Sequence, residues 1–379
     1  MKDIKPNVDT ATLSQWQLIN LRFRRHRLAV FSMRVLVCLY VVAIGAPFFA
    51  PYTLEHRDLD YAYCPPQMPQ WSWSDGWHTA AIRQHLDPVT LKNEYIVDPS
   101  VRVPLGFFVR GDEYRILGNW KGSLRFFGVD LEKAAERGVL AGPDDPRPVF
   151  HIAGADRYGR DVFSRLIYGS RISLSIGLIS IFAAFILGVG IGGISGYLGG
   201  KTDIFIQRFI EVLNSFPHIP LWLAIAAVLP QSWTSLQVYF AITVLLSLLN
   251  WTNLARVVRG KILALREEDY AVAARLLGAN HGRILFRHLV PGFTSHIIVT
   301  LTLSVPGMIL GETALSFLGL GLRPPIVSWG VMLQETLNLQ VVANYPWMLL
   351  PVISIIITVL AFNFLGDGLR DAADPYADR

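Results

Sequence analysis

Residues 267–291 read EEDYAVAARLLGANHGRILFRHLVP, a charged stretch between two long apolar runs. The acidic residues Glu267–Asp269 suit a helix N-terminus, and Arg275 suits the C-terminus of the same helix. Gly278 follows at the position where a left-handed cap ends a helix. The stretch therefore predicts a short helix in a loop outside the bilayer.

Three alanines give this predicted helix small side chains: Ala271, Ala273 and Ala274. We expect them to leave one surface thin, so that another protein can approach the backbone closely. A second basic segment, Gly282–His288, follows and stops at Pro291.

The spacing of small residues and proline resembles the "EAA" loop of ABC-transporter permeases. That loop has two alanines, a glycine four residues on and a proline thirteen further. The resemblance implies an ATPase-coupling loop that contains Asp269, Ala273, Ala274, Gly278 and Pro291. Three positions depart from the family: Val272 stands for a glutamate, His288 for an isoleucine and Val290 for a leucine. An ordinary helical hairpin with a glycine cap is the alternative.

The composition predicts a polytopic membrane protein. Of 379 residues, 52% are hydrophobic and 17% charged, and the mean hydropathy is +0.38, values that are unusual for a soluble domain. Cys38 and Cys64 predict no disulfide, because Cys38 lies inside an apolar run. The first apolar run is too long for a cleaved signal peptide, so we expect a retained anchor.

Six apolar runs predict six membrane helices. They are Leu28–Phe49, Ser173–Tyr197, Ile206–Leu229, Leu236–Leu254, Phe293–Leu318 and Trp347–Leu365. Asn214–Pro217 predicts a kink in the third helix. Gly188, Gly192 and Gly196 recur every four residues in the second, a spacing that lets membrane helices pack closely.

The distribution of basic residues predicts the orientation. Arg22, Arg24, Arg25 and Arg27 precede the first span, and residues 252–292 carry seven Lys and Arg, whereas the short outer loops carry only Arg323. Positive charge collects on the cytoplasmic side, so both termini are expected there. A membrane-flanking signal is a better interpretation of the first cluster than a nucleic-acid site.

Residues 52–170 form a long polar interval after the first span. It holds 14 Lys and Arg, 16 Asp and Glu, and enough aromatic side chains for a small core. Tyr114–Leu117 and Ser123–Val129, separated by a turn with glycine, predict a β-hairpin. We therefore expect an extracytoplasmic inserted domain of mixed or β-rich structure.

These observations predict an all-α polytopic membrane protein with six transmembrane helices and one inserted domain. The predicted segments are a cytoplasmic N-terminus (1–27), a first membrane helix (28–50), the inserted domain and connector (51–170), a membrane core (171–366) with the coupling loop (255–291), and a cytoplasmic tail (367–379).

Three further segments resemble dipeptide/oligopeptide-type ABC permeases. They are GADRYGRDVFSR at 154–165, GETALSFLGLG at 311–321 and GDGLRD at 366–371. Within the second, Glu312 is costly in a hydrophobic span unless it faces protein or water. Glu312 and Ser316 are therefore candidates for the translocation path. A structural carboxylate bonded to neighbouring hydroxyls or backbone is the alternative.

The resemblance implies a permease subunit of a bacterial inner-membrane ABC importer for peptides. Its implied partners are a second permease subunit, two cytoplasmic ATP-binding subunits, an extracytoplasmic solute-binding protein and membrane lipid. We expect no enzymatic activity, cofactor, metal site or nucleic-acid partner. Gly199–Thr202 does not complete a phosphate-binding loop, because Ser195 stands at its first required glycine.

Two alternatives stay open on the sequence. The same architecture could carry another solute, such as a nickel chelate or an opine. A self-contained channel or secondary transporter is the other, and the spans show no clear pair of broken, inverted-repeat helices that would favour it.

Overall fold

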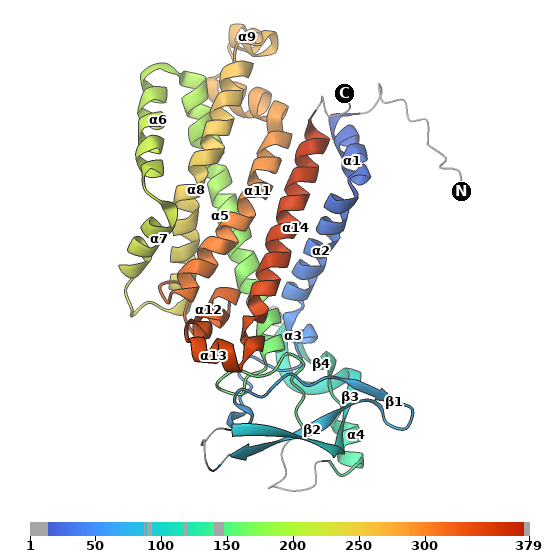
Figure 1. Ribbon diagram of the computed structural model, residues 1–379. Coiled ribbons are helices and arrows are strands. Elements are labelled where there is room, and N and C mark those ends of the chain that lie inside the picture. Colours follow the sequence, from blue (N-terminus) through green and yellow to red (C-terminus); the bar gives the residue numbers. More distant parts are fainter. Residues whose placement is uncertain (1–13, 87, 89–92, 117–119, 140–147, 375–379) are drawn as a thin grey trace, which may run out of the picture. The chain divides into compact units, whose positions relative to one another are not determined.

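The computed structural model describes residues 14–86, 88, 93–116, 120–139 and 148–374 (Figure 1). The chain divides into two units, each assembled from distant parts of the sequence. Unit 1 comprises Met1–Cys38, Ile176–Gly311 and Ile356–Arg379, and unit 2 comprises Leu39–Ser175 and Glu312–Ile355.

Long apolar helices dominate the chain, as expected for a polytopic membrane protein. Five helical segments among the described residues are long and apolar enough to span a membrane, and one bent pair would make a sixth. The five are Arg27–Ile44, Val162–Leu198, Ser235–Leu265, His281–Phe317 and Pro346–Ala373.

The third predicted span differs from the sequence expectation. Two helices, α6 (Gly200–Ser215) and α7 (His218–Ala227), replace one helix over 206–229 and meet at 81°. The break falls at Phe216–Pro217, inside the segment predicted to kink. Proline cannot continue the hydrogen-bond ladder, and it forces the residue before it into extended backbone, here with ψ 135° at Phe216.

Unit 1 contains the short helices at one end of the bundle as well as long helical segments. Its complete elements are α1 (Gln15–Arg25), α6, α7, α8 (Ser235–Leu265), α9 (Asp269–Leu276), α10 (His281–Arg283), the π-helical turn η3 (Ile284–Leu289) and the 3-10 turn η4 (Val290–Phe293). Parts of α2 (Arg27–Ile44), α5 (Val162–Leu198), α11 (Thr294–Phe317) and α14 (Leu350–Ala373) also belong to it. Figure 1 shows α9 beyond the end of α8.

Two of these helices are much longer than their predicted spans. Helix α5 begins 11 residues before Ser173, because Asp161 caps its N-terminus: the Ser164 amide donates to Asp161 Oδ2 at 2.7 Å. Helix α8 continues 11 residues past Leu254, with Val258 and Ile262 buried on the bundle side. Both extensions contain polar residues, so the continuous apolar runs from which the spans were predicted do not include them.

Unit 2 contains the inserted segment, which forms an antiparallel sheet in the order β1-β2-β3-β4. The strands are β1 (Gln70–Ser72), β2 (Gly76–Leu86), β3 (Asn93–Ile116) and β4 (Trp120–Val129). Strands β3 and β4 confirm the predicted hairpin, since Tyr114 pairs with Gly122 and Val109 with Arg125. Of the predicted turn between Leu117 and Ser123, residues 118 and 119 lie outside the described residues, and 120–122 belong to β4.

Short helices complete unit 2. They are α3 (Ala46–Phe49), η2 (Leu59–Tyr61), α4 (Leu131–Glu136), α12 (Trp329–Leu333), η5 (Gln334–Leu337), α13 (Leu339–Asn344) and η6 (Pro346–Leu349). Helix α3 follows α2 after a single residue, Gly45, so the predicted first membrane helix is two helical pieces. At the other end of the chain, α14 extends to Ala373, well into the predicted tail.

Candidate functional site

The loop around α9 ends its helix with a complete Schellman motif. Gly278 has φ +81°; its amide donates to the Arg275 carbonyl at 3.0 Å, and the Ala279 amide donates to the Ala274 carbonyl at 3.1 Å. Asn280 then caps the next turn, because its Oδ1 accepts from the Arg283 amide at 2.8 Å. The chain direction after α9 is therefore held by hydrogen bonds.

The alanines of α9 do not share one outer surface, which corrects the expectation from sequence. Ala271 is fully buried and packs with Ile262 and Leu289, and Ala274 packs against the same cluster. Residues three apart lie on one helix face, and here that face contacts unit 1. Ala273 is exposed on the other side. Small residues therefore serve packing within the chain at two of these three positions.

Large apolar side chains cover the outer side of this loop. Leu276 and Leu277 are 83% and 88% exposed, and Tyr270 is also exposed. Neighbouring aliphatic side chains in full contact with water, on a rigidly capped helix, are typical of an interaction surface. These leucines were not among the site residues predicted from the sequence, although they directly precede Gly278.

Polar contacts connect the base of the α9 loop to neighbouring helices of unit 1. Arg266 at the C-terminus of α8 donates to the Gly196 carbonyl at 3.1 Å and to the Tyr197 carbonyl at 3.3 Å. Arg259 makes two hydrogen bonds, of 2.5 and 2.6 Å, to the Asp203 carboxylate on α6. A two-pronged pair of this kind is directional as well as attractive. These contacts hold the C-terminal part of α8, from which the α9 loop begins, against α5 and α6.

The three spaced glycines of α5 lie against α8. A Cβ atom at Gly192 would lie 2.4 Å from the Ala255 carbonyl oxygen, and one at Gly188 would lie 2.8 Å from the Leu254 side chain. At Gly196 it would lie 2.8 Å from the Arg259 carbonyl oxygen. Real Cβ atoms do not approach so closely, so these positions allow two backbones to touch.

Glu312 lies at the centre of a buried hydroxyl cluster in unit 2. Its carboxylate accepts hydrogen bonds from Ser316 at 2.8 Å, Ser328 at 2.7 Å and Ser173 at 3.2 Å, and all four side chains are enclosed. The cluster joins α5, α11 and the N-cap of α12. Buried polar groups of this kind are stable when each has a partner.

The three serines of this cluster also accept hydrogen bonds from backbone amides. Ser316 Oγ accepts from the Leu322 amide at 3.0 Å, Ser328 Oγ from the Val331 amide at 3.1 Å, and Ser173 Oγ from the Trp329 amide at 3.2 Å. Glu312 thus organises hydroxyl groups that in turn fix the turn after α11 and the start of α12. Its geometry is that of the structural alternative, a carboxylate bonded to neighbouring hydroxyls.

The segment 154–165 forms a second polar cluster in unit 2. Asp156 Oδ1 accepts from the amides of Tyr158 and Arg160, and Oδ2 lies 2.7 Å from Arg160 Nε and 3.5 Å from Arg165 Nε. Burial, followed by the nearby Asp156 charge, raises the pKa of Glu335, which contacts Arg160 at 3.6 Å. The alternating Asp and Arg therefore form a largely buried network. The sequence pattern by itself, in contrast, is typical of a solvated connector.

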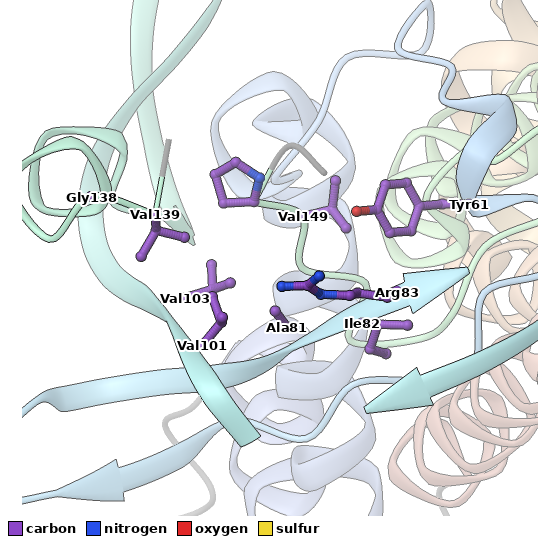
Figure 2. A pocket seen from close by; sticks show the side chains of 10 residues that line it. Tyr61, Ala81, Ile82, Arg83, Val101, Val103, Gly138, Val139 and Val149 are labelled. Carbon is purple, nitrogen blue, oxygen red and sulfur yellow. The ribbon is translucent and has the colours of Figure 1, made fainter. Parts of the chain in front are cut away.

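The inserted sheet contains a small cavity of about 110 Å³ (Figure 2). Its walls are mostly apolar, with Val101, Val103 and Val149 among them, and Arg83 adds the one cation of the described lining. Arg83 Nε lies 3.2 Å from Asp98 Oδ2. Val139 and Pro148 border residues 140–147, which the structure does not describe, and the lining includes none of the site residues predicted from the sequence.

Among the described residues, no group of three or more His, Cys, Asp or Glu side chains is arranged to hold a metal ion.

Family comparisons match both ends of the chain. The family described as "binding-protein-dependent transport system inner membrane component" matches residues 188–379, more than half of the chain. A second family, the N-terminal transmembrane domain of oligopeptide transport permease C, matches residues 14–66. The inserted sheet lies entirely between these two matches.

Several curated proteins are similar to the chain. An oligopeptide transport system permease protein of Bacillus subtilis (strain 168) is 40% identical over 237 residues, 62% of this chain and 75% of the relative. A dipeptide transport system permease protein of Alkalihalophilus pseudofirmus is 41% identical over 226 residues, 59% of this chain and 72% of the relative. A glutathione transport system permease protein of Pectobacterium atrosepticum is 41% identical over 225 residues, with the same two coverages.

Proposed function

The chain belongs to the family of binding-protein-dependent transport system inner membrane components, and we propose that it is one permease subunit of an ABC importer for peptides. The family consists of transporter components, and the apolar helices make this chain a multi-pass membrane protein. Relatives named as oligopeptide and dipeptide permeases favour peptides over nickel chelates or opines as the solute. The same relatives favour an importer subunit over a self-contained channel or secondary transporter.

The observation that carries the proposal is the α9 loop. A capped helix that presents Leu276 and Leu277 to water fits a groove on a cytoplasmic ATP-binding subunit. Asp269, Ala273 and Gly278 belong to this surface or fix its direction, Ala274 packs it against unit 1, and Pro291 lies in the turn that follows the loop. The Arg266 and Arg259 contacts would then transmit ATP-driven movement to α5 and α6, and so alternate access to the path.

The proposed complex contains further subunits. We propose two ATP-binding subunits, a second permease subunit and an extracytoplasmic solute-binding protein, and the binding-protein-dependent family supports partners of this kind. This chain would supply half of the translocation path and contact membrane lipid along its helices, with no nucleic-acid partner. Glu312 and Ser316 would serve the path indirectly, because they fix the start of α12 and the turn before it.

The proposed orientation places both termini and α9 in the cytoplasm of a bacterium, and the inserted sheet outside. Its basis is the set of seven Lys and Arg in residues 252–292 and the four arginines before the first span. A membrane-impermeant thiol reagent applied to intact cells should label Trp73→Cys, at a side chain that is 97% exposed, and leave Leu276→Cys unlabelled. The opposite labelling pattern would reverse the orientation.

The docking surface is tested by two charged substitutions. Leu276→Asp and Leu277→Asp should leave the chain inserted, yet reduce co-purification of the ATP-binding subunits and transport-linked ATP hydrolysis about tenfold or more, as at other apolar interface centres. Leu59→Asp, also at an exposed leucine but in the inserted segment, is the matched control and should keep the ATP-binding subunits bound. Normal subunit binding and hydrolysis in both loop variants would exclude α9 as the docking element.

A further inference from the structure

An exposed aromatic surface lies on the β3–β4 hairpin of the inserted sheet. Phe107 and Phe108 are 53% and 59% exposed, and Phe126 and Leu124 on the neighbouring strand are exposed as well. The Phe126 ring centroid lies 5.7 Å from those of Phe107 and Phe108, so the three rings form one cluster. We call Phe107, Phe108, Leu124 and Phe126 the phenylalanine patch.

Phe108 holds its ring in this patch at a conformational cost. Its φ is +57°, the left-handed region, which a bulky side chain rarely adopts. Strain of this kind persists only where surrounding structure enforces it, and it concentrates at functional positions. An exposed phenylalanine in strained backbone would be an unusual feature for a surface that only contacts water.

The patch is continuous with the end of the first membrane span. Helix α2 has 18 residues and a length of about 27 Å, close to the thickness of about 30 Å of a bilayer's hydrocarbon core. Phe48 and Phe49 in α3 follow directly, and Phe48 lies 6.2 Å from Phe108 and 5.9 Å from Phe126 between ring centroids. The patch therefore lies at the level where the hydrocarbon ends.

A buried arginine fixes the hairpin at this level. Arg125 on β4 is 1% exposed, and its Nη1 donates to the carbonyl oxygens of Pro47 at 2.7 Å and Ala50 at 3.0 Å. Its Nη2 donates to the Asp112 carbonyl at 3.1 Å. These bonds satisfy carbonyl groups at α3 and so hold the hairpin against the short helix that follows the first span.

We propose that the phenylalanine patch inserts into the bilayer leaflet that surrounds the C-terminal end of the first span. Apolar rings held at the edge of the hydrocarbon gain burial by entering the acyl region, to a depth of about 5–10 Å for interfacial elements in general. The side chain of Arg110, next to the patch, is 81% exposed and lies 3.8 Å from Glu132 Oε1, so its outward side can also contact lipid phosphates. The inserted sheet thus rests on lipid as well as on the first span.

Spin labels in the assembled transporter, reconstituted in lipid nanodiscs, test the proposal. The label is attached to Phe108→Cys or Leu124→Cys in a Cys38→Ser background, with Trp73→Cys as the matched exposed control. Leu124 reports on the same patch without altering the strained residue. Accessibility to oxygen, which concentrates in the bilayer, is compared with accessibility to a water-soluble nickel chelate.

Lipid contact predicts an oxygen-to-nickel accessibility ratio several-fold higher at 108 and 124 than at 73. Equal ratios at the three positions would show a patch in water and would overturn the proposal. Low accessibility to both reagents, with an immobilised spectrum, would show a protein partner on the patch and would overturn it equally. Because the readout is local, loss of peptide transport does not affect its interpretation.

Discussion

The α9 loop exposes apolar side chains to water, whereas the Glu312 cluster buries polar side chains. The loop leaves Leu276 and Leu277 in water at the C-terminus of a helix that a Schellman motif ends. The cluster encloses a carboxyl group and gives it three hydroxyl donors within the same chain. A completed polar cluster needs no partner, whereas exposed leucines on a rigid helix gain stability only when another surface covers them. Both regions match family motifs, yet their environments indicate different roles.

The largest expected effect is at Glu312. Glu312→Leu leaves three enclosed hydroxyls without their acceptor, which should cost about 3 kcal/mol or more of folding free energy and prevent recovery of assembled complex. Glu312→Gln keeps an amide oxygen as acceptor and should recover much of that loss. Thermal unfolding of the purified complex measures both. Normal thermal stability in the Leu variant, with transport abolished, would instead place Glu312 in the path.

The next effect separates the two faces of α9. Ala274→Asp introduces charge into the packed face and should destabilise the loop by about 2 kcal/mol, whereas Ala273→Asp introduces it on the exposed face. Hydrogen exchange across residues 266–293 should accelerate in the first variant only. Both variants are expected to weaken ATPase binding, the first through loop order and the second through contact. Equal exchange rates in the two variants would contradict the assignment of faces.

A smaller effect is expected from the backbone conformation at Gly278. No atom lies within 4 Å of a Cβ built there, so Gly278→Ala should cost about 1 kcal/mol through its positive φ alone. Gly282→Ala is the matched control, because the nearest atom to its Cβ is 3.8 Å away and its φ is not positive. The ratio of peptide uptake to ATP hydrolysis should fall in the first variant. An equal ratio of peptide uptake to ATP hydrolysis in the two variants would show that the Schellman geometry has no part in coupling transport to hydrolysis.

The smallest expected effect is the absence of thiol labelling at Cys64 in the folded protein. Cys64 is fully buried, and burial, with a contribution from Asp161, raises its pKa to about 12. At pH 8 the thiolate fraction is on the order of 10⁻⁴, so maleimide should label Leu276→Cys in a Cys38→Ser protein and spare Cys64. Denaturant should make Cys64 react. Rapid native labelling of Cys64 would show that its surroundings open.

The sequence by itself determined the class of protein and much of its order. Apolar runs located five spans, because roughly 20 apolar residues are needed to cross a bilayer and few other folds tolerate them. The acidic start and Gly278 located α9, since a helix dipole and a left-handed cap depend on nearest neighbours in the chain. Two strand-like segments separated by a turn with glycine located the part of the β3–β4 hairpin next to its turn, for the same local reason.

Only the tertiary structure decided which residues meet. The partners of Glu312 come from positions 139 residues away at Ser173 and 16 away at Ser328, and Arg125 reaches Pro47 over 78 residues. No local pattern specifies such pairs, because their stability arises from burial and hydrogen bonds between distant elements. The sequence also did not identify which face of α9 packs inward. Alanine is common in both buried and exposed positions, so only the fold decides what surrounds Ala271 and Ala274.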